Sequence, residues 1–232
     1  MKILCSICAR GNSKGLKNKN IKLFNGRPLI WHSINQARKS KIFSKIICSS
    51  DSSKILKIAK DSGVDLNIKR SKKLSSGKCP KKDVIKDVIL KAEKFYGEKY
   101  DLIFDLDITS PVRKIKDIKN CLKALKKIKK PCNLITICES KKNPHFNMIK
   151  IKNKKLSIAI PPKKDIPSRQ LAPKIYDMNA SIYAWNRKGF FKLKDIINQN
   201  TIYYKMPISS SFDIDSVIDF KISELLFKKI FR

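Results

Sequence analysis

The fold is decided by the N-terminal stretch MKILCSICARGNSKG, residues 1–15, in which a short apolar run passes directly into a basic turn. Residues 2–8 are rich in Ile, Leu and Cys and predict a buried first strand. A polar loop with two glycines follows over residues 10–25. In a parallel sheet such a loop lies at the carboxyl edge, where ligands bind. The stretch therefore predicts a ligand site directly after the first strand.

Short apolar runs alternate with helical patterns along the rest of the chain. Further strands are expected at 44–49, 64–68, 101–106, 133–138, 180–185 and, briefly, 212–215. Helices are expected from Pro28 onward and over 52–61, 82–96, 116–129 and 216–230. This alternation is typical of an α/β fold with a mostly parallel, Rossmann-like sheet covered on both faces. A single domain over residues 1–232 accommodates the pattern.

The rhythm changes between residues 140 and 173, where five prolines interrupt short polar strands. We interpret this region, about 140–180, as an inserted arm or hairpin rather than a linker. The last helix is expected to bury an apolar stripe in the core. That stripe includes Ile218, Ile222, Leu225 and Leu226.

Composition indicates a globular protein, with 42% apolar residues in a chain of 232. No apolar run approaches the roughly 20 residues of a membrane span, and the N-terminal run is too short for a signal peptide. Seven cysteines, an odd number, suit a reducing compartment. Cys5 and Cys8 would point to opposite faces of a strand and so could not share a metal. We therefore expect a cytoplasmic protein.

The formal net charge is +34, from 53 basic and 19 acidic residues. Such an excess favours anionic partners, which include nucleic acids, membranes and phosphorylated small molecules. Lys is spread through every segment, and basic clusters interleaved with aromatic residues are absent. We expect no nucleic-acid or membrane partner, although a basic nucleic-acid-binding protein stays open as the non-enzymatic alternative.

The turn after the first predicted strand has the composition of an anion-binding loop. Its glycines permit backbone conformations that direct successive N–H groups at an anion. The loop adds donors at Arg10, Ser13, Lys14 and Lys19. It is not a Walker A loop, because Lys14 precedes Gly15. The pattern predicts a triphosphate site, with an ordinary turn as the alternative.

Two pairs of aspartates follow predicted strands. Asp213 and Asp215 would project to one face of a short strand, where paired carboxylates suit Mg²⁺ and substrate phosphates. A solvated turn before the last helix is the alternative. Asp105 and Asp107 end the fourth predicted strand at the same edge of the sheet. Further donors follow there at Thr109, Ser110 and Arg113.

A third group of polar residues surrounds the sixth predicted strand. Arg169 can hold a carboxylate in a bidentate fork, and Asn179 and Tyr183 offer hydrogen bonds at the mouth of the strand. Ordinary surface polarity is the alternative. The chain has two histidines, too few for a Ser-His-Asp or Cys-His mechanism to be favoured.

Three motifs, taken together and in this order, resemble the nonulosonate cytidylyltransferases, the CMP-sialic acid synthetase family. They are ARGNSKGLKNKNI at 9–21, LDITSPVR at 106–113 and SFDIDSVIDF at 211–220. The family forms read LQPTSPLR for the second motif and SIDIDT for the third. The resemblance implies a fold of the nucleotide-diphospho-sugar transferase (GT-A-like) type with a protruding dimerisation arm, and hence a homodimer.

The resemblance also implies residue roles. The positions that match the nucleotide site are Arg10, Gly11, Asn12, Ser13, Lys14, Asn20 and Arg70. The catalytic positions are Arg10, Lys19 and Asp215. Asp213 and Asp215 match the ligands of Mg²⁺ or Mn²⁺. Those that match the sugar site are Asp107, Thr109, Ser110, Arg169, Asn179 and Tyr183.

The chain departs from the family pattern at three places. Asp107 replaces a Gln that faces the sugar, GKCP at 77–80 replaces an Asp-Thr/Ser stretch, and MNASIY at 178–183 replaces PNGAIY. Asp107, together with NPHFN at 143–147 and YDMNASIYAW at 176–185, looks like the branch that acts on legionaminic acid and related diamino sugars. An Asp in place of the Gln would act as an anionic acceptor for a different donor on the sugar.

The implied reaction joins CTP and a nine-carbon α-keto sugar acid to give a CMP-sugar and pyrophosphate. Legionaminic acid or its N,N'-diacetyl derivative is the preferred sugar, and N-acetylneuraminate, pseudaminate and Kdo are the alternatives. Whether Asp215 acts as a base or only as a metal ligand stays open at this stage.

Overall fold

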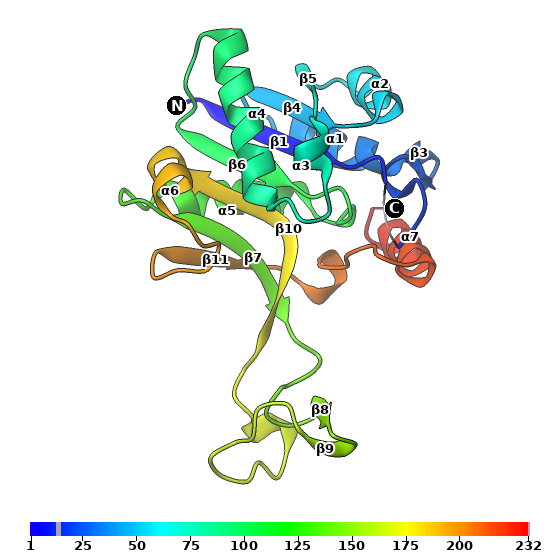
Figure 1. Ribbon diagram of the computed structural model, residues 1–232, viewed down its shortest axis with the longest axis vertical. Helices are drawn as coiled ribbons and strands as arrows, with labels where there is room; N and C mark the ends of the chain where they lie inside the picture. The colour runs from blue at the N-terminus through cyan, green and yellow to red at the C-terminus, as the bar shows by residue number, and fades with distance from the viewer. Residues whose placement is uncertain (13–14, 232) are drawn as a thin grey trace.

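The computed structural model describes residues 1–12 and 15–231. Ser13 and Lys14, two positions of the predicted triphosphate loop, lie outside the described residues. Figure 1 shows a layered body of sheet and helices from which a narrow arm projects.

Within these residues, seven strands form one sheet in the order β11-β7-β10-β6-β1-β4-β5. The strands are β1 (Ile3–Ala9), β4 (Lys45–Ser50), β5 (Leu66–Lys69), β6 (Leu102–Leu106), β7 (Asn133–Glu139), β10 (Tyr176–Asn186) and β11 (Thr201–Lys205). β10 runs antiparallel to β6 and β7, and the other pairs are parallel. The predicted α/β fold with a mostly parallel sheet is confirmed, whereas β11 is a strand that the sequence analysis did not predict.

Helices cover both faces of this sheet. On one face lie α1 (Leu29–Ser40), α2 (Ser53–Asp61), α5 (Ile115–Lys126) and, at one end, α7 (Val217–Phe231). On the other face lie α4 (Lys81–Tyr96) and α6 (Arg187–Lys192), with the short α3 (Lys72–Ser75) before α4. None of the helices in the described residues is long and apolar enough to cross a membrane.

Strand β1 is buried on both faces because helices lie on each side of it. Ile3, Cys5 and Ile7 belong to the apolar cluster under α1, α2 and α5. Leu4 belongs to the cluster under α4 and α6, and Cys8 packs against that cluster. The two thiols of the C-x-x-C therefore lie on opposite faces of the sheet, as the strand period predicts.

The arm leaves the body after β7 and returns along β10. It carries a two-stranded hairpin of β8 (Ile149–Lys152) and β9 (Lys155–Ile158) and one turn of 3-10 helix, η2 (Arg169–Leu171). The pairing of β10 with β7 shifts register between Met178 and Tyr183, and Ala180 has a φ of 54° inside this bulge. The arm thus extends two neighbouring strands of the central sheet (Figure 1).

Two expectations about the C-terminal segment are wrong. Residues 212–215 form no strand, because their backbone donors bond elsewhere: Ile214 N donates to the carbonyl of Thr109 at 3.0 Å, and Asp215 N donates to the side chain of Asp219. Ser216 and Asp219 bond each other reciprocally at the start of α7, which is a capping box. The segment is therefore an extended connection that ends in a helix cap.

Helix α7 also buries a different face from the predicted one. Ile218 and Leu225 are each 69% exposed, and Ile222 is exposed as well. Phe220 is buried instead, because its ring and that of Phe227 pack edge-on against Phe24. Phe24 belongs to the small hairpin of β2 (Leu23–Phe24) and β3 (Arg27–Pro28), which the sequence pattern did not predict.

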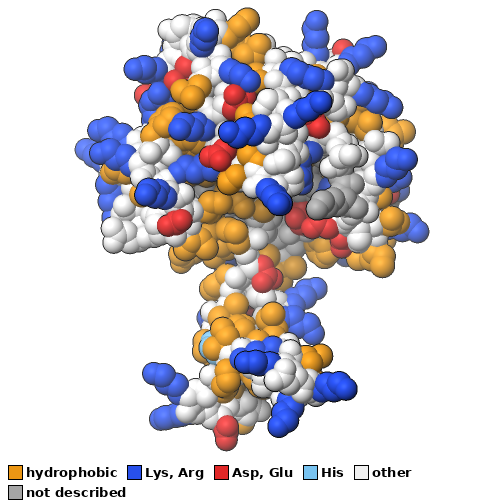
Figure 2. Space-filling model, viewed as in Figure 1, with side chains coloured by type: hydrophobic (Ala, Val, Ile, Leu, Met, Phe, Trp, Pro, Cys, Tyr) orange, Lys and Arg blue, Asp and Glu red, His pale blue; other side chains and the backbone are white. Residues whose placement is uncertain are grey.

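Basic side chains are dispersed over the surface. Figure 2 shows Lys and Arg on all parts of the visible face, on the body and on the arm alike. Apolar side chains gather on the arm and where the arm joins the body (Figure 2). In the arm hairpin, Ile149, Ile151 and Leu156 are 61%, 71% and 67% exposed.

Candidate active site

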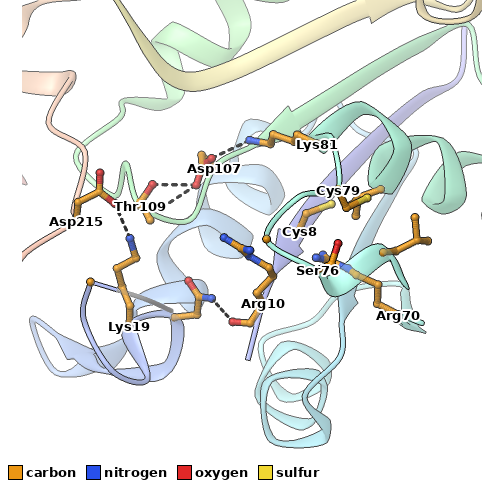
Figure 3. A pocket seen from close by; sticks show the side chains of 15 residues that line it. Cys8, Arg10, Lys19, Arg70, Ser76, Cys79, Lys81, Asp107, Thr109 and Asp215 are labelled. Carbon is orange, nitrogen blue, oxygen red and sulfur yellow. Dashed lines mark hydrogen bonds and ion pairs between the residues drawn. The ribbon is translucent and has the colours of Figure 1, made fainter. Parts of the chain in front are cut away.

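A cavity of about 380 Å³ opens at the carboxyl ends of β1, β5 and β6 (Figure 3). Segments far apart in the sequence form its walls: the loop after β1, the 3-10 turn η1 (Lys19–Ile21), the α3–α4 connection, the loop after β6 and the segment before α7. The predicted site residues that line it are Arg10, Lys19, Asn20, Arg70, Asp107, Thr109 and Asp215.

The loop after β1 is held in place by its own polar groups. Asn20 is buried, and its Nδ2 donates to the carbonyl of Arg10 at 2.8 Å. Gly11 N donates to Oδ1 of Asp51 at 2.8 Å, which ties the loop to the end of β4. These bonds fix the backbone and leave the Arg10 guanidinium directed into the cavity (Figure 3).

A close backbone approach explains the glycine at position 15. A Cβ added there would lie 2.3 Å from the backbone oxygen of Asp215. The loop after β1 and the segment before α7 can therefore touch only because residue 15 has no side chain.

Lys19 and Asp215 join these same two segments by an ion pair. Lys19 Nζ lies 2.9 Å from Oδ1 of Asp215 and donates to the carbonyl of Ile214 at 2.5 Å. The lysine side chain is 11% exposed, whereas that of Asp215 is 78% exposed. A mostly buried cation thus holds an accessible carboxylate at the cavity.

The second carboxylate of this segment belongs to Asp213. Desolvation raises the pKa of Asp213 to about 6, and the nearby charges of Asp107 and Asp215 act in the same direction. A carboxylate whose neighbours repel its charge is a site that a cation stabilises. The buried Ile214 lies between the two residues and leaves both carboxylates outside the core.

Arg70 enters the cavity from the side opposite Lys19 and Asp215 (Figure 3). It directly follows β5, is 6% exposed, and its Nη2 donates to the carbonyl of Ser49 at 2.7 Å. Arg10 and Arg70 together make this side of the cavity strongly basic (Figure 3). The arrangement suits an anionic ligand with several charges.

Lys81 is a cavity residue that the sequence analysis missed. Its Nζ lies 2.8 Å from Oδ2 of Asp105 and 2.7 Å from Oδ2 of Asp107. These carboxylates raise the pKa of Lys81 well above its ordinary value, against the effect of burial. Lys81 in turn keeps the pKa of Asp107 well below the ordinary range, also against burial. The sequence offered one hint of this lysine: Asp107 stands where the family pattern has Gln, and a partly buried carboxylate needs a cation nearby.

Arg113 supports Asp107 from behind. Its side chain is completely buried and donates to the backbone carbonyls of Asp107 and Ser181, the hydroxyl of Ser33 and the side chain of Gln36. Burial lowers the pKa of Arg113 to about 10, so the group stays cationic at neutral pH. The buried guanidinium of Arg113 therefore fixes the backbone of the loop after β6.

The other predicted residues lie away from the cavity lining. Asn179 is buried in the β10 bulge, where it accepts from Thr136 and donates to Ser211. Ser110 is buried, and Asn12 is exposed. Tyr183 is buried, and its ring centroid lies 4.8 Å from Nζ of Lys81. Arg169 lies on the arm, where it donates to the carbonyl of Ser140 at 3.3 Å.

The carboxylates fit a divalent cation by their chemistry. The described residues contain no group of three or more His, Cys, Asp or Glu side chains placed to hold a metal. Asp215 lines the basic cavity, and Asp213, two residues before it, lies outside the lining; together they would supply two oxygen ligands. Mg²⁺ uses one or two carboxylates in this way when substrate phosphates and water supply the other ligands.

The fold and the cavity are those of an α/β protein with a basic pocket at the carboxyl edge of its sheet. Over residues 4–229 the chain matches the family model described as cytidylyltransferase. The chain belongs to the cytidylyltransferase family and is an enzyme of that class.

Two relatives are similar over nearly their whole length. The chain is 39% identical to post-translational flagellin modification protein B of Campylobacter coli, over 98% of this chain and 95% of the relative. It is also 39% identical to CMP-N,N'-diacetyllegionaminic acid synthase of Campylobacter jejuni, over 97% and 94%.

A solved structure with a similar fold is CMP:2-keto-3-deoxy-manno-octonic acid synthetase in complex with CTP. It superimposes with a TM-score of 0.71 at 14% identity and covers 99% of each chain. At this identity the likeness concerns the fold alone.

Proposed function

We propose that this cytidylyltransferase transfers CMP from CTP to a nine-carbon α-keto sugar acid of the legionaminic acid type and releases pyrophosphate. The observation that carries the proposal is the 39% identity, over 97% of the chain, with a CMP-N,N'-diacetyllegionaminic acid synthase. The proposed location is the cytoplasm, where the free cysteines of the described residues would stay reduced.

The triphosphate of CTP is assigned to the basic side of the cavity. Arg10 and Arg70 lie there, and Lys19 lines the same cavity beside Asp215. Gly11 and Asn12, in the loop after β1, are assigned to the same nucleotide site. Ser13 and Lys14 complete the proposed nucleotide site. These groups would stabilise the negative charge that develops on the departing pyrophosphate.

The sugar acid is assigned to the wall that contains Asp107 and Thr109, with the buried Tyr183 ring next to the Lys81 ammonium. Ser110 and Asn179 would shape this wall from behind, because both are buried. Arg169 would bind the carboxylate of the sugar. Since Arg169 lies on the arm, this role requires the arm of a second copy to reach the cavity, and the proposal therefore includes a homodimer.

In the proposed reaction the anomeric hydroxyl oxygen attacks the α-phosphorus, and the bond to the pyrophosphate oxygen breaks. Asp213 and Asp215 would hold Mg²⁺ or Mn²⁺, which when bound neutralises phosphate charge and orients the reacting groups. Asp215, held 2.9 Å from Lys19, is assigned the proton of the attacking hydroxyl. The accessible position of its carboxylate suits that task.

The substrate assignment is tested by pyrophosphate release from CTP with legionaminate, N-acetylneuraminate, pseudaminate and Kdo in parallel. We expect release with the legionaminate type far above the others. Release with Kdo or pseudaminate alone would contradict the sugar assignment, and release with none would contradict the proposed function.

The metal assignment is tested by chelation and by substitution. EDTA is expected to stop pyrophosphate release, and excess Mg²⁺ or Mn²⁺ to restore it. Asp215→Ala is expected to lower turnover by at least about a thousandfold while the circular dichroism spectrum stays unchanged. Near-normal activity in this variant would refute the assignment, and Asp61→Ala on the surface of α2 is the matched control.

A further inference from the structure

Lys81 occupies a central position in the cavity that the assigned nucleotide and metal roles leave unused. It is the first residue of α4, directly after Pro80 at the helix cap. Its ammonium lies within 2.8 Å of two carboxylates, Asp105 and Asp107, and over the ring of Tyr183. The side chain is nevertheless 32% exposed, so it also faces the cavity. Lys81 therefore contacts the two carboxylates on one side and faces the cavity on the other.

The two carboxylates are already occupied on the protein side. Asp105 is 1% exposed, and its Oδ1 accepts from Ser6 at 2.6 Å. Oδ1 of Asp107 accepts from the amide and the hydroxyl of Thr109 at 3.2 and 2.9 Å, and Oδ2 faces Lys81. The acid at position 107 thus serves mainly to hold the lysine, rather than to accept directly from a sugar hydroxyl as its position in the sequence suggests.

A lysine ammonium has three N–H donors. One of them is donated to Oδ2 of Asp107, and the ammonium forms an ion pair at 2.8 Å with Oδ2 of Asp105, an oxygen that accepts no hydrogen bond from the described residues. The position of the ammonium is fixed, because the two carboxylates and the Tyr183 ring hold it, and a donor remains for a ligand in the cavity. A donor fixed in this way before the ligand binds selects for an acceptor at one place.

The charges around Lys81 indicate what kind of acceptor it takes. The two carboxylates balance the charges of Lys81 and of the buried Arg113, so this group has no net positive charge to attract an anion. A phosphate or a carboxylate is better placed beside Arg10 and Arg70, which lie away from these carboxylates (Figure 3). The acceptor that fits is an uncharged oxygen.

We propose that Lys81 is a specificity-determining residue that donates a hydrogen bond to the amide carbonyl of an N-acyl group on the sugar acid. This inference rests on the proposed function, because it assigns the sugar acid to this wall of the cavity. Asp107 is then a positioning residue that acts through Lys81.

The test is a comparison of steady-state kinetics for the full-length enzyme and Lys81→Met, which keeps the length of the side chain and removes its donors. We expect the KM for the N-acylated sugar acid to rise at least about tenfold, with the KM for CTP within about twofold of the wild-type value. Lys86→Met, an exposed position of the same helix, is the matched control.

A de-N-acylated form of the same sugar acid separates the carbonyl from other acceptors. Removal of the acyl group should raise the KM of the wild-type enzyme about as much as Lys81→Met does, and should have little further effect on the variant. If removal of the acyl group raised the sugar KM equally in wild type and in Lys81→Met, the acyl assignment would be overturned. A rise in the KM for CTP instead would assign Lys81 to the nucleotide and overturn the proposal.

Lys81→Met leaves two carboxylates without their cation, so the same comparison is repeated in an Asp107→Asn background, which lowers this repulsion. An unchanged sugar KM in both backgrounds would overturn the inference while the proposed function stands. A wild-type enzyme that neither binds nor converts any N-acylated sugar acid would overturn both.

Discussion

At the scale of single residues, the buried Arg113 has the largest predicted effect on stability. Arg113→Met would leave the carbonyls of Asp107 and Ser181 without their donor, and it is expected to lower the free energy of unfolding by about 3–5 kcal/mol. Urea denaturation measures this loss. Arg38→Met, an exposed arginine on α1, should change it by less than about 1 kcal/mol. Equal effects of the two substitutions would contradict the structural role of Arg113.

His32 gives the protein a predictable response to pH. Burial lowers the pKa of His32 below 6.5, and its Nε2 donates to the carbonyl of Phe24 at 2.8 Å. The unfolded chain binds this proton first as the pH falls through about 6.5, so the free energy of unfolding falls with it. His32→Gln should remove this pH-dependent part of the free energy of unfolding. Urea denaturation of wild type and variant at pH 5–8 measures it, because the contributions of carboxylates such as Asp213 are the same in both proteins and cancel in the difference. A difference in unfolding free energy that does not depend on pH would contradict the assignment.

The residues that line the cavity were predictable where a single sequence motif contains them. Arg10, Lys19 and Asp215 line it as expected, because each lies in a compact motif beside the expected sheet edge. Lys81 could not be predicted, because its role arises from a contact with Asp107, 26 residues away. Asn179 was expected to face a ligand, but the unpredicted bulge in β10 turns it into the protein interior.

At the scale of elements, the contact between the loop after β1 and the segment before α7 controls the geometry of the site. Gly15→Ala would place a Cβ 2.3 Å from the backbone of Asp215, so one of the segments must move. We expect kcat/KM to fall roughly tenfold to a hundredfold, because small displacements of reacting groups are costly. Gly97→Ala, at the end of α4, should instead lower stability by about 1 kcal/mol and leave kinetics unchanged. Unchanged kinetics in Gly15→Ala would contradict the proposed contact.

The elements of the sheet were predictable because apolar runs and helical periods alternate clearly. For helix α7, the helical period does not predict which face is buried. The helix has apolar residues on several sides, so the helical period selects no single buried face. Packing of Phe220 and Phe227 against Phe24, a residue from the other end of the chain, decides the orientation instead.

At the scale of the whole molecule, the arm presents apolar side chains that its own hairpin cannot cover. The proposed homodimer would bury them against a second copy. Ile151→Asp, at a side chain that is 71% exposed, is expected to convert a dimer of twice 26.7 kDa into a monomer. Light scattering measures the mass, and Lys155→Ala in the same hairpin is the control. A monomeric wild type would refute the proposed homodimer.

The attachment of the arm has a consequence for how such enzymes diversify. The chain leaves the body along β7 and re-enters along β10, and a hydrogen bond of 3.1 Å from Ser140 N to the carbonyl of Ile175 closes the base. The residues between Ser140 and Ile175 thus form a single insertion into the body. Its length and sequence can therefore change without altering the register of the sheet. The arm is an exchangeable module, and a chimaera that takes its arm from a relative should retain the same body.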